Sequence, residues 1–152
     1  MKTIRYCSIG AGGMSRRGHG PALKALAAAR PELELAAVCA LEKAAAQRYA
    51  AEFGYRRAYT DYHRMLAEEK PDAVSVVVPV QHTCAIACDV LERGFPVFME
   101  KPPGIDLAEG RRIADAARKA GKLTLVAFNR RHMPLVRRMK ALLSERRPQK
   151  LR

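Results

Sequence analysis

A lysine that follows an apolar run and precedes two prolines has the setting best suited to chemistry in this sequence. Lys101 comes directly after the run 96–99 and Glu100, and Pro102 and Pro103 stiffen the turn and fix its direction. An ammonium group held there could hydrogen-bond a substrate hydroxyl or carbonyl and stabilise negative charge as a hydride moves. The alternative is an ordinary lysine in a solvent-exposed turn. Glu100 could bond a ribose hydroxyl or simply pair with Lys101.

A glycine pattern near the N-terminus is the second candidate site. It reads Gly10-x-Gly12-x-x-Ser15, with Gly13 adding room, and it lies between the apolar run 4–9 and a helical repeat of apolar residues. Gly10 would permit a tight turn, and Gly12 would let the backbone approach a pyrophosphate. The following helix N-terminus would offer free N–H groups to the phosphates. A glycine-rich turn without a ligand is the alternative, but the position between strand and helix favours phosphate binding.

The elements that must hold these residues alternate between strand and helix patterns. The predicted strands are residues 4–9, 33–39, 57–59, 73–78, 96–99 and 123–128. Helix patterns fill the intervals, with Thr60 or Asp61 as one N-cap and Asp106 with Glu109 as a capping box. Such alternation predicts an α/β fold, a Rossmann-type doubly wound parallel sheet with helices on both faces.

Three polar loops follow predicted strands, at 79–82, 100–101 and 129–132. Ligands of open parallel sheets gather at the carboxyl ends of the strands, so these loops should converge. His82 could shape the ligand pocket or cap the helix after it. Asn129, Arg130 and Arg131 could line the same cleft, and for Arg131 a surface position is equally compatible with the sequence.

The composition fits one folded domain. The 152 residues are 49% hydrophobic, and no run approaches the roughly 18 apolar residues that a membrane span needs. No signal-peptide pattern is evident, so we expect a cytoplasmic protein without a membrane contact.

The basic charge of the chain is concentrated near its C-terminus. The formal net charge is +13, and residues 130–152 contain nine Lys or Arg and one acid. Such a tail could bind nucleic acid through phosphates, but it lacks interleaved aromatics and any helix-turn-helix or zinc pattern. We therefore expect a solvated basic helix, or one that meets an acidic partner domain, and not a nucleic-acid-binding segment.

The four cysteines do not form a disulfide framework. Cys7 and Cys39 fall inside strand-like runs, where thiols act as small hydrophobes. Cys84 and Cys88 lie four residues apart on a predicted helix with His82 nearby. Because only three ligands are in view and no second pair exists, we expect no metal site.

Taken together, the motifs resemble the N-terminal domain of the Gfo/Idh/MocA family, which includes glucose–fructose oxidoreductase and inositol dehydrogenase. The resemblance covers nearly the whole chain. It rests on the glycine turn from Gly10 to Ser15, Tyr59-Thr60-Asp61-Tyr62, Pro79-x-x-His82, Glu100-Lys101-Pro102 and Phe128-Asn129-Arg130-Arg131. The Glu-Lys-Pro tripeptide after a strand is the most specific of these motifs.

The resemblance implies an NAD- or NADP-dependent oxidoreductase that acts on a sugar, cyclitol or related polyol. It implies that Lys101 touches the reacting carbinol as the catalytic residue. It places at the cofactor the residues Gly10, Gly12, Gly13, Met14, Ser15, Ala40, Pro79, His82, Glu100, Lys101 and Asn129.

Two departures from the family pattern affect these expectations. The acid common after the second strand is Ala40 here, so NAD and NADP both stay open, and Arg16, Arg17 or Lys43 could reach a 2′-phosphate. Family members also carry a second, sheet-rich domain that forms the substrate floor and usually supplies a catalytic histidine.

We therefore expect residues 1–133 to form an NAD(P)-binding Rossmann domain. Residues 134–152 should form a basic helix at the start of a C-terminal α+β domain that is absent from this sequence. With that domain present, we expect a homo-oligomer. The alternative is a truncated, catalytically incomplete cofactor-binding module that acts in sensing or assembly.

Overall fold

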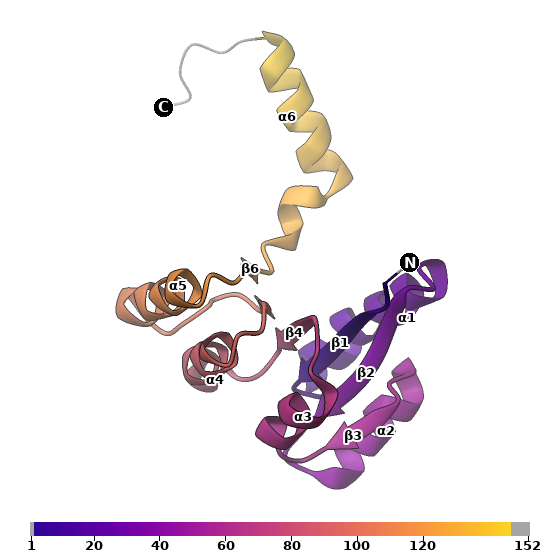
Figure 1. Ribbon diagram of the computed structural model, residues 1–152. Coiled ribbons are helices and arrows are strands. Elements are labelled where there is room, and N and C mark those ends of the chain that lie inside the picture. Colours follow the sequence, from indigo (N-terminus) through magenta and orange to yellow (C-terminus); the bar gives the residue numbers. More distant parts are fainter. Residues whose placement is uncertain (1, 147–152) are drawn as a thin grey trace.

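A six-stranded parallel sheet forms the centre of the protein, as seen in a computed structural model that describes residues 2–146 (Figure 1). The strands are β1 (Ile4–Ile9), β2 (Leu33–Cys39), β3 (Arg57–Tyr59), β4 (Ala73–Val76), β5 (Val97–Met99) and β6 (Thr124–Val126). Their order is β3-β2-β1-β4-β5-β6, and every neighbouring pair is parallel. The prediction of a Rossmann-type doubly wound sheet is therefore confirmed.

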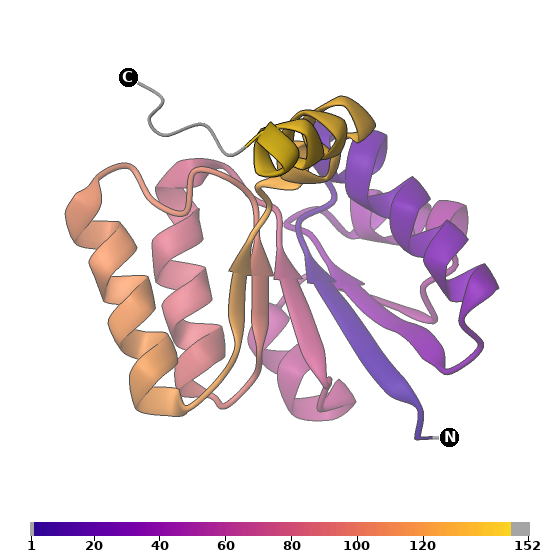
Figure 2. The same cartoon turned by 90° about the horizontal axis from the view of Figure 1, so that it is seen from above.

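Helices connect the strands and cover both faces of the sheet (Figure 2). They are the π-helical turn η1 (Ser15–His19), α1 (Gly20–Ala29), α2 (Lys43–Phe53), α3 (Tyr62–Glu69), α4 (Val80–Glu92), α5 (Leu107–Ala120), the 3₁₀ turn η2 (Asn129–His132) and α6 (Pro134–Arg146). The crossovers from β1 to β3 lie on one face, and those from β3 to β6 lie on the other, as right-handed connections require.

Each face of the sheet has its own apolar core. Helices α1 and α2 cover a smaller core around Leu35, Val38 and Tyr49. Helices α3, α4 and α5 cover a larger one that includes Met65 and Val90. The sheet residues alternate between these two cores, because successive side chains of a strand point to opposite faces.

Several element boundaries differ from the sequence prediction. Strand β4 ends at Val76, the last residue that pairs with β1 and β5. Strand β6 is confined to three residues. The predicted loop 79–82 is wrong from its second residue, since α4 begins at Val80 and includes His82. Pro79 occupies the N-cap position of α4, where the N–H that proline lacks would have no helical acceptor.

The predicted helix caps are present. Asp61 rather than Thr60 caps α3, and its carboxylate accepts the backbone N–H of His63 at 2.8 Å. Asp106 accepts the N–H of Glu109 at 2.8 Å, and the Glu109 carboxylate reaches back to a backbone N–H just before the helix. Both caps satisfy donors that the first helical turn leaves without partners.

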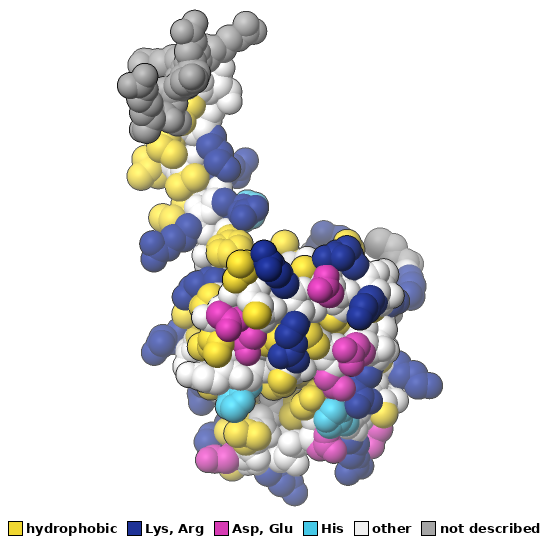
Figure 3. Space-filling view, turned by 90° about the vertical axis from the view of Figure 1, so that its left-hand side faces the viewer, with side chains coloured by type: hydrophobic (Ala, Val, Ile, Leu, Met, Phe, Trp, Pro, Cys, Tyr) yellow, Lys and Arg dark blue, Asp and Glu magenta, His cyan; other side chains and the backbone are white. Residues whose placement is uncertain are grey.

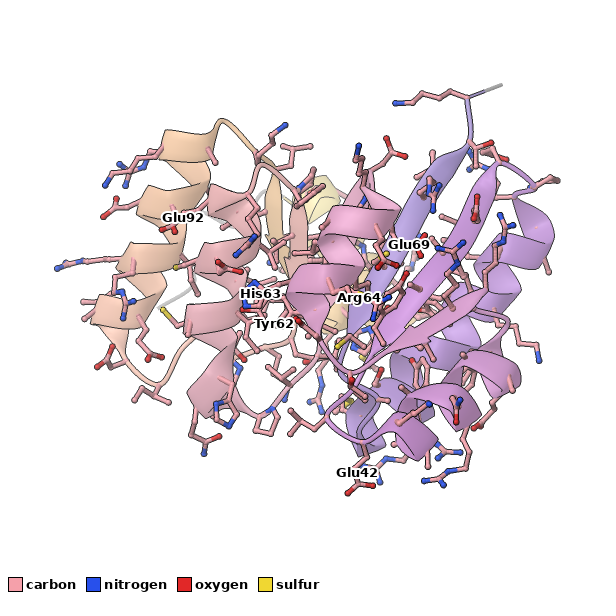
Figure 4. All side chains as sticks on the ribbon, turned by 60° about the horizontal axis from the view of Figure 1, so that its bottom comes forward. Glu42, Tyr62, His63, Arg64, Glu69 and Glu92 are labelled. Carbon is pink, nitrogen blue, oxygen red and sulfur yellow. The ribbon has the colours of Figure 1, made fainter. Side chains whose placement is uncertain are left out.

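A buried carboxylate ties the end of α3 to the sheet, which the sequence did not indicate. Glu69, labelled in Figure 4, is 3% exposed and forms a salt bridge with Arg5 of β1. Its Oε1 accepts the Tyr59 hydroxyl at 2.6 Å and pairs with Arg57 at 3.2 Å. The carboxylate thus joins β1, β3 and α3 away from the ends of the strands where ligands gather.

Helix α6 projects from the body of the domain (Figure 3). It packs chiefly on η2, and its apolar side is left open, with Leu135 76% and Met139 51% exposed. The predicted helix is therefore present, and its predicted end at Pro148 lies outside the described residues. Helix α6 thus has the apolar face that its sequence predicts, but no other part of the described chain covers that face.

Candidate functional site

A concave site lies where the strand order reverses, between the carboxyl ends of β1 and β4. It is a cavity of about 550 Å³, which is within the range of small-molecule sites. Its lining consists of Ile9, Gly10, Ala11, Gly12, Cys39, Ala40, Leu41, Glu42, Ala45, Thr60, Tyr62, Val77, Val78, Pro79, His82 and Ile86. Five residues predicted at the cofactor are among them: Gly10, Gly12, Ala40, Pro79 and His82.

Gly10 makes the turn out of β1 possible. Its φ is +107°, and its N–H donates to the Cys39 carbonyl oxygen at 2.8 Å. A Cβ here would overlap the carbonyl oxygen of Val77 and lie 2.8 Å from the carbonyl carbon. Only glycine fits this close approach between the first turn and the chain leaving β4.

Gly12 differs from Gly10 because nothing in the protein restricts it. A Cβ on Gly12 would have no protein atom within 4 Å. The Gly12 carbonyl accepts the N–H of Arg16 at 2.9 Å, so the helix starts here and the N–H groups of the next three residues precede any helical bond. Open space beside free N–H groups at a helix start is the arrangement that binds phosphate.

Ser15 explains why the third position of the glycine pattern is not glycine. It is 1% exposed, and its hydroxyl lies 2.7 Å from the hydroxyl of Tyr49 on α2. A small residue here thus permits close packing of the two helices, with an added polar contact.

The segment after β2 forms the wall of the cavity where a Rossmann site usually holds the adenosine ribose. Ala40 offers no carboxylate there, but Glu42 lines the cavity at the start of α2 (Figure 4). Leu41 is 97% exposed, which leaves an apolar side chain free at the rim. Of the cationic candidates, Arg16 is bound to Glu52 on α2, and Arg17 lies against Gly13.

The opposite wall comes from the chain leaving β4. Pro79 is the N-cap of α4, and no side chain forms a capping hydrogen bond at this helix start. The alternative that His82 caps the helix is therefore wrong. His82 instead lies in the first turn, exposed, with its side chain among the cavity-lining residues. Nearby, burial raises the pKa of Tyr62, and burial raises the pKa of the Cys39 thiol to about 11. Near pH 7 both side chains are therefore uncharged, and they line the cavity as neutral groups.

Lys101 lies at the same edge of the sheet as the glycine turn. It lies two residues after β5, it is exposed, and its ammonium forms no salt bridge among residues 2–146. Glu100 does not pair with that ammonium. Its Oε1 lies 2.7 Å from Nε2 of His19, and its Oε2 accepts the backbone N–H of Lys101 at 3.0 Å. The lysine turn is thus joined to the helix that the glycine turn begins.

Gly13, Met14 and Asn129 do not line the cavity. Gly13 and Met14 form the first helical turn beside it, and Asn129 is exposed at the start of η2, beyond β6. Their cofactor roles remain predictions. Sequence reasoning missed Leu41 and Thr60 as lining residues. Thr60 directly follows β3, so the rule that ligands gather at strand ends could have found it.

Two kinds of feature are absent from the described part of the chain, a cluster of metal ligands and a helix able to cross a membrane. Among residues 2–146, no cluster of three or more His, Cys, Asp or Glu side chains is arranged to hold a metal ion. Within the same range, none of the helices combines the length and the apolar character required to cross a membrane.

Comparison with known proteins agrees with this geometry. The profile of an oxidoreductase family described as having an NAD-binding Rossmann fold, Gfo/Idh/MocA, matches residues 4–128. A D-glucoside 3-dehydrogenase of Escherichia coli is 34% identical over 128 residues, which span 84% of this chain and 35% of that protein. A scyllo-inositol 2-dehydrogenase (NAD(+)) of Bacillus subtilis is 29% identical over 122 residues, 80% of this chain and 35% of the relative.

A solved structure gives the same result. The structure of a 3-ketoreductase from Actinomadura kijaniata in complex with NADP and TDP-benzene superposes with a TM-score of 0.83 at 28% identity, covering 95% of this chain and 43% of that one. The chain thus spans about a third of the length of the curated relatives it matches. With its fold, its glycine turn and this match across most of its length, the chain belongs to the Gfo/Idh/MocA family of oxidoreductases with an NAD-binding Rossmann fold.

Proposed function

We propose that this chain forms the NAD(P)-binding half of a dehydrogenase that acts on a sugar, a cyclitol or a related polyol. One observation carries the proposal. The cavity at the β1–β4 switch point is bordered by a glycine turn with open space at Gly12, and the turn that carries Lys101 is joined to the same helix. A dinucleotide needs these two features at one edge of a sheet, because its pyrophosphate lies in the middle of an extended molecule and its reactive ring lies at one end.

The residues of this edge fit such a cofactor. The space that a Cβ at Gly12 would fill is open, and the free N–H groups of the first helical turn beside it suit a pyrophosphate. The segment 40–42 would hold the adenosine ribose, and Pro79 and His82 would border the cofactor on the β4 side. The names of the relatives include both NAD(+) and NADP, so either cofactor is compatible with the family.

Lys101 is the residue we propose for the chemistry. A bound nicotinamide supplies the acceptor or donor of a hydride. The Lys101 ammonium would donate a hydrogen bond to the oxygen of the reacting carbinol and stabilise the alkoxide charge that this oxygen carries before the hydride leaves. The same charge grows on the oxygen in the reverse direction, when the carbonyl carbon accepts a hydride. Its lack of a salt-bridge partner among residues 2–146 leaves it available for this contact.

The polyol substrate class is supported by the relatives, since the two curated ones act, by their names, on a glucoside and on an inositol. The division at residue 133 also remains a proposal. It is supported by the way α6 packs chiefly on η2 and not on the sheet.

Isothermal titration of the chain with NADH and with NADPH tests the proposal. We expect saturable binding of at least one of them, with the Gly12→Ala variant as the matched control that loses it. No heat of binding from either dinucleotide with the folded chain would contradict the proposed function.

A further inference from the structure

A histidine that no sequence pattern singled out makes the contact between the two candidate motifs. His19 ends the π-helical turn η1, and Glu100 follows β5, 81 residues later. Their Nε2 and Oε1 atoms are 2.7 Å apart, and the two side chains are only 17% and 16% exposed. The imidazole edge packs on the ring of Phe98, with 5.6 Å between centroids and 67° between planes. His19 is therefore held between a carboxylate and an aromatic ring of one strand end.

The Glu100 carboxylate bridges two donors. A carboxylate only accepts, so Nε2 of His19 carries the hydrogen of this bond. The other oxygen accepts the backbone N–H of Lys101 at 3.0 Å. One side chain thus fixes the start of the lysine turn relative to the helix that follows the glycine turn. Without His19, the Glu100 carboxylate would have no contact with this helix, and it would be free to leave the Lys101 N–H.

The π-helical turn is what lets His19 reach β5. Ser15 contacts Tyr49 of α2, and Gly20 faces the ring of Phe53, also on α2. In a regular α-helix, residues five apart point about 140° away from each other, so both could not face α2. Here the N–H of Gly20 bonds the carbonyl of Ser15, which places one residue above the other. The extra residue of this wide turn leaves His19 on the side that faces β5.

We propose that His19 is a positioning residue for Lys101, set by the π-helical turn and acting through Glu100. It fixes the lysine turn relative to the helix that follows the glycine turn. This inference rests on the proposed function for its effect on NAD(P), but the contact itself can be tested without a cofactor. His19 touches neither the cavity nor a reacting atom in this arrangement, so its action is on the placement of the turn.

The test compares three variants of the whole chain with the parent. His19→Ala removes the donor, and His19→Gln returns an N–H donor at a similar reach. Lys24→Ala is the matched control, because Lys24 lies on the same helix and bonds a backbone carbonyl of α2 at 2.9 Å, on the side away from β5. For each variant, amide hydrogen exchange at Lys101 is measured by NMR, and NADH and ADP are titrated calorimetrically. ADP reports on the glycine turn and the adenosine end only.

In His19→Ala, we expect exchange at the Lys101 amide to rise about tenfold and NADH affinity to fall about tenfold, with ADP affinity unchanged. His19→Gln should restore both, and Lys24→Ala should change neither. Equal losses for NADH and ADP, or unchanged exchange at Lys101 in a folded His19→Ala protein, would overturn the proposal. If the parent binds neither ligand, the proposed function fails, and the exchange data alone then decide whether His19 places the lysine turn.

Discussion

Two separate variants, Gly10→Ala and Gly12→Ala, distinguish a glycine that the fold requires from one that a ligand would require. The two glycines are two residues apart in the same turn. A Cβ at Gly10 overlaps the Val77 carbonyl, whereas a Cβ at Gly12 meets no protein atom within 4 Å. Gly10→Ala should therefore damage the fold, and Gly12→Ala should damage only the binding of a dinucleotide.

The structure allows the cost of Gly10→Ala to be worked out from two parts. The positive φ of +107° costs an L-residue about 1–2 kcal/mol. Relief of the overlap must move the Val77 backbone, whose N–H bonds the Ile9 carbonyl at 2.8 Å, and overpacking of this kind costs about 1–3 kcal/mol. The sum is about 2–5 kcal/mol, which corresponds to a loss of roughly 5–20 °C in melting temperature for a chain of this size.

Gly54→Ala supplies the control for the first part. Gly54 ends α2 with a φ of +85° and has nothing within 4 Å of its Cβ position. It should lose only the backbone cost of about 1–2 kcal/mol. Thermal unfolding followed by circular dichroism ranks the three variants, and calorimetric titration with NADH measures binding. We expect Gly10→Ala to melt lowest, Gly54→Ala next and Gly12→Ala with the parent, while Gly12→Ala loses at least about tenfold in NADH affinity. Parent-like melting of Gly10→Ala, or parent-like NADH binding by Gly12→Ala, would refute the reasoning.

Three further changes test other parts of the structure. Ala40→Asp should raise the ratio of NADH affinity to NADPH affinity by about tenfold, because a carboxylate there can bond the ribose hydroxyls and repels a 2′-phosphate. An unchanged ratio in paired calorimetric titrations would show that Ala40 does not face the ribose. Gly20→Ala places a Cβ 2.7 Å from the buried Phe53 ring and should cost about 1–3 kcal/mol of unfolding free energy in urea titrations, while Gly18→Ala, which meets only ordinary contacts, should not destabilise. Burial raises the pKa of the Cys7 thiol from 9.0 to about 12, so between these pH values the folded chain keeps a proton that the unfolded chain loses. The contribution of this thiol to the free energy of unfolding should be constant below pH 9 and should fall by about 1.4 kcal/mol per pH unit toward pH 12, so unfolding in urea at pH 8 to 11 should show a smaller fall for Cys7→Ala than for the parent.

The sequence was sufficient for the sheet because its signals are local. A run dense in β-branched residues, such as 73–78, is typical of a strand covered on both faces, and Gly54 and Gly121 end helices in the structure. Boundaries were less certain. Val77 and Val78 have strand-forming side chains, but they lie past the last pairing of the sheet, which depends on the length of the neighbouring strands rather than on residue type.

The site was predictable only where one strand end meets one motif. Gly10, Gly12 and Pro79 could be placed because each follows a strand, and parallel strands end at one edge. The contact of His19 with Glu100 could not be predicted, because it depends on a π-helical turn. Residue types alone do not indicate which carbonyl each N–H of a helix will bond. Leu41 became part of the cavity through the order of the strands, which no single segment specifies, whereas Thr60 directly follows β3 and the same rule could have placed it.

The two glycines of the turn also show how a short motif should be interpreted. At the switch point, the helices on either side of the β1–β4 boundary cover opposite faces, so the chain leaving β4 passes directly against the turn after β1. Close packing therefore requires glycine at Gly10 whether or not a ligand binds, and its presence indicates the fold. Gly12 has no such structural reason, since a side chain there would meet nothing in the described protein. Because the packing gives no reason for glycine at this position, Gly12 points to a molecule that must come close to the backbone there.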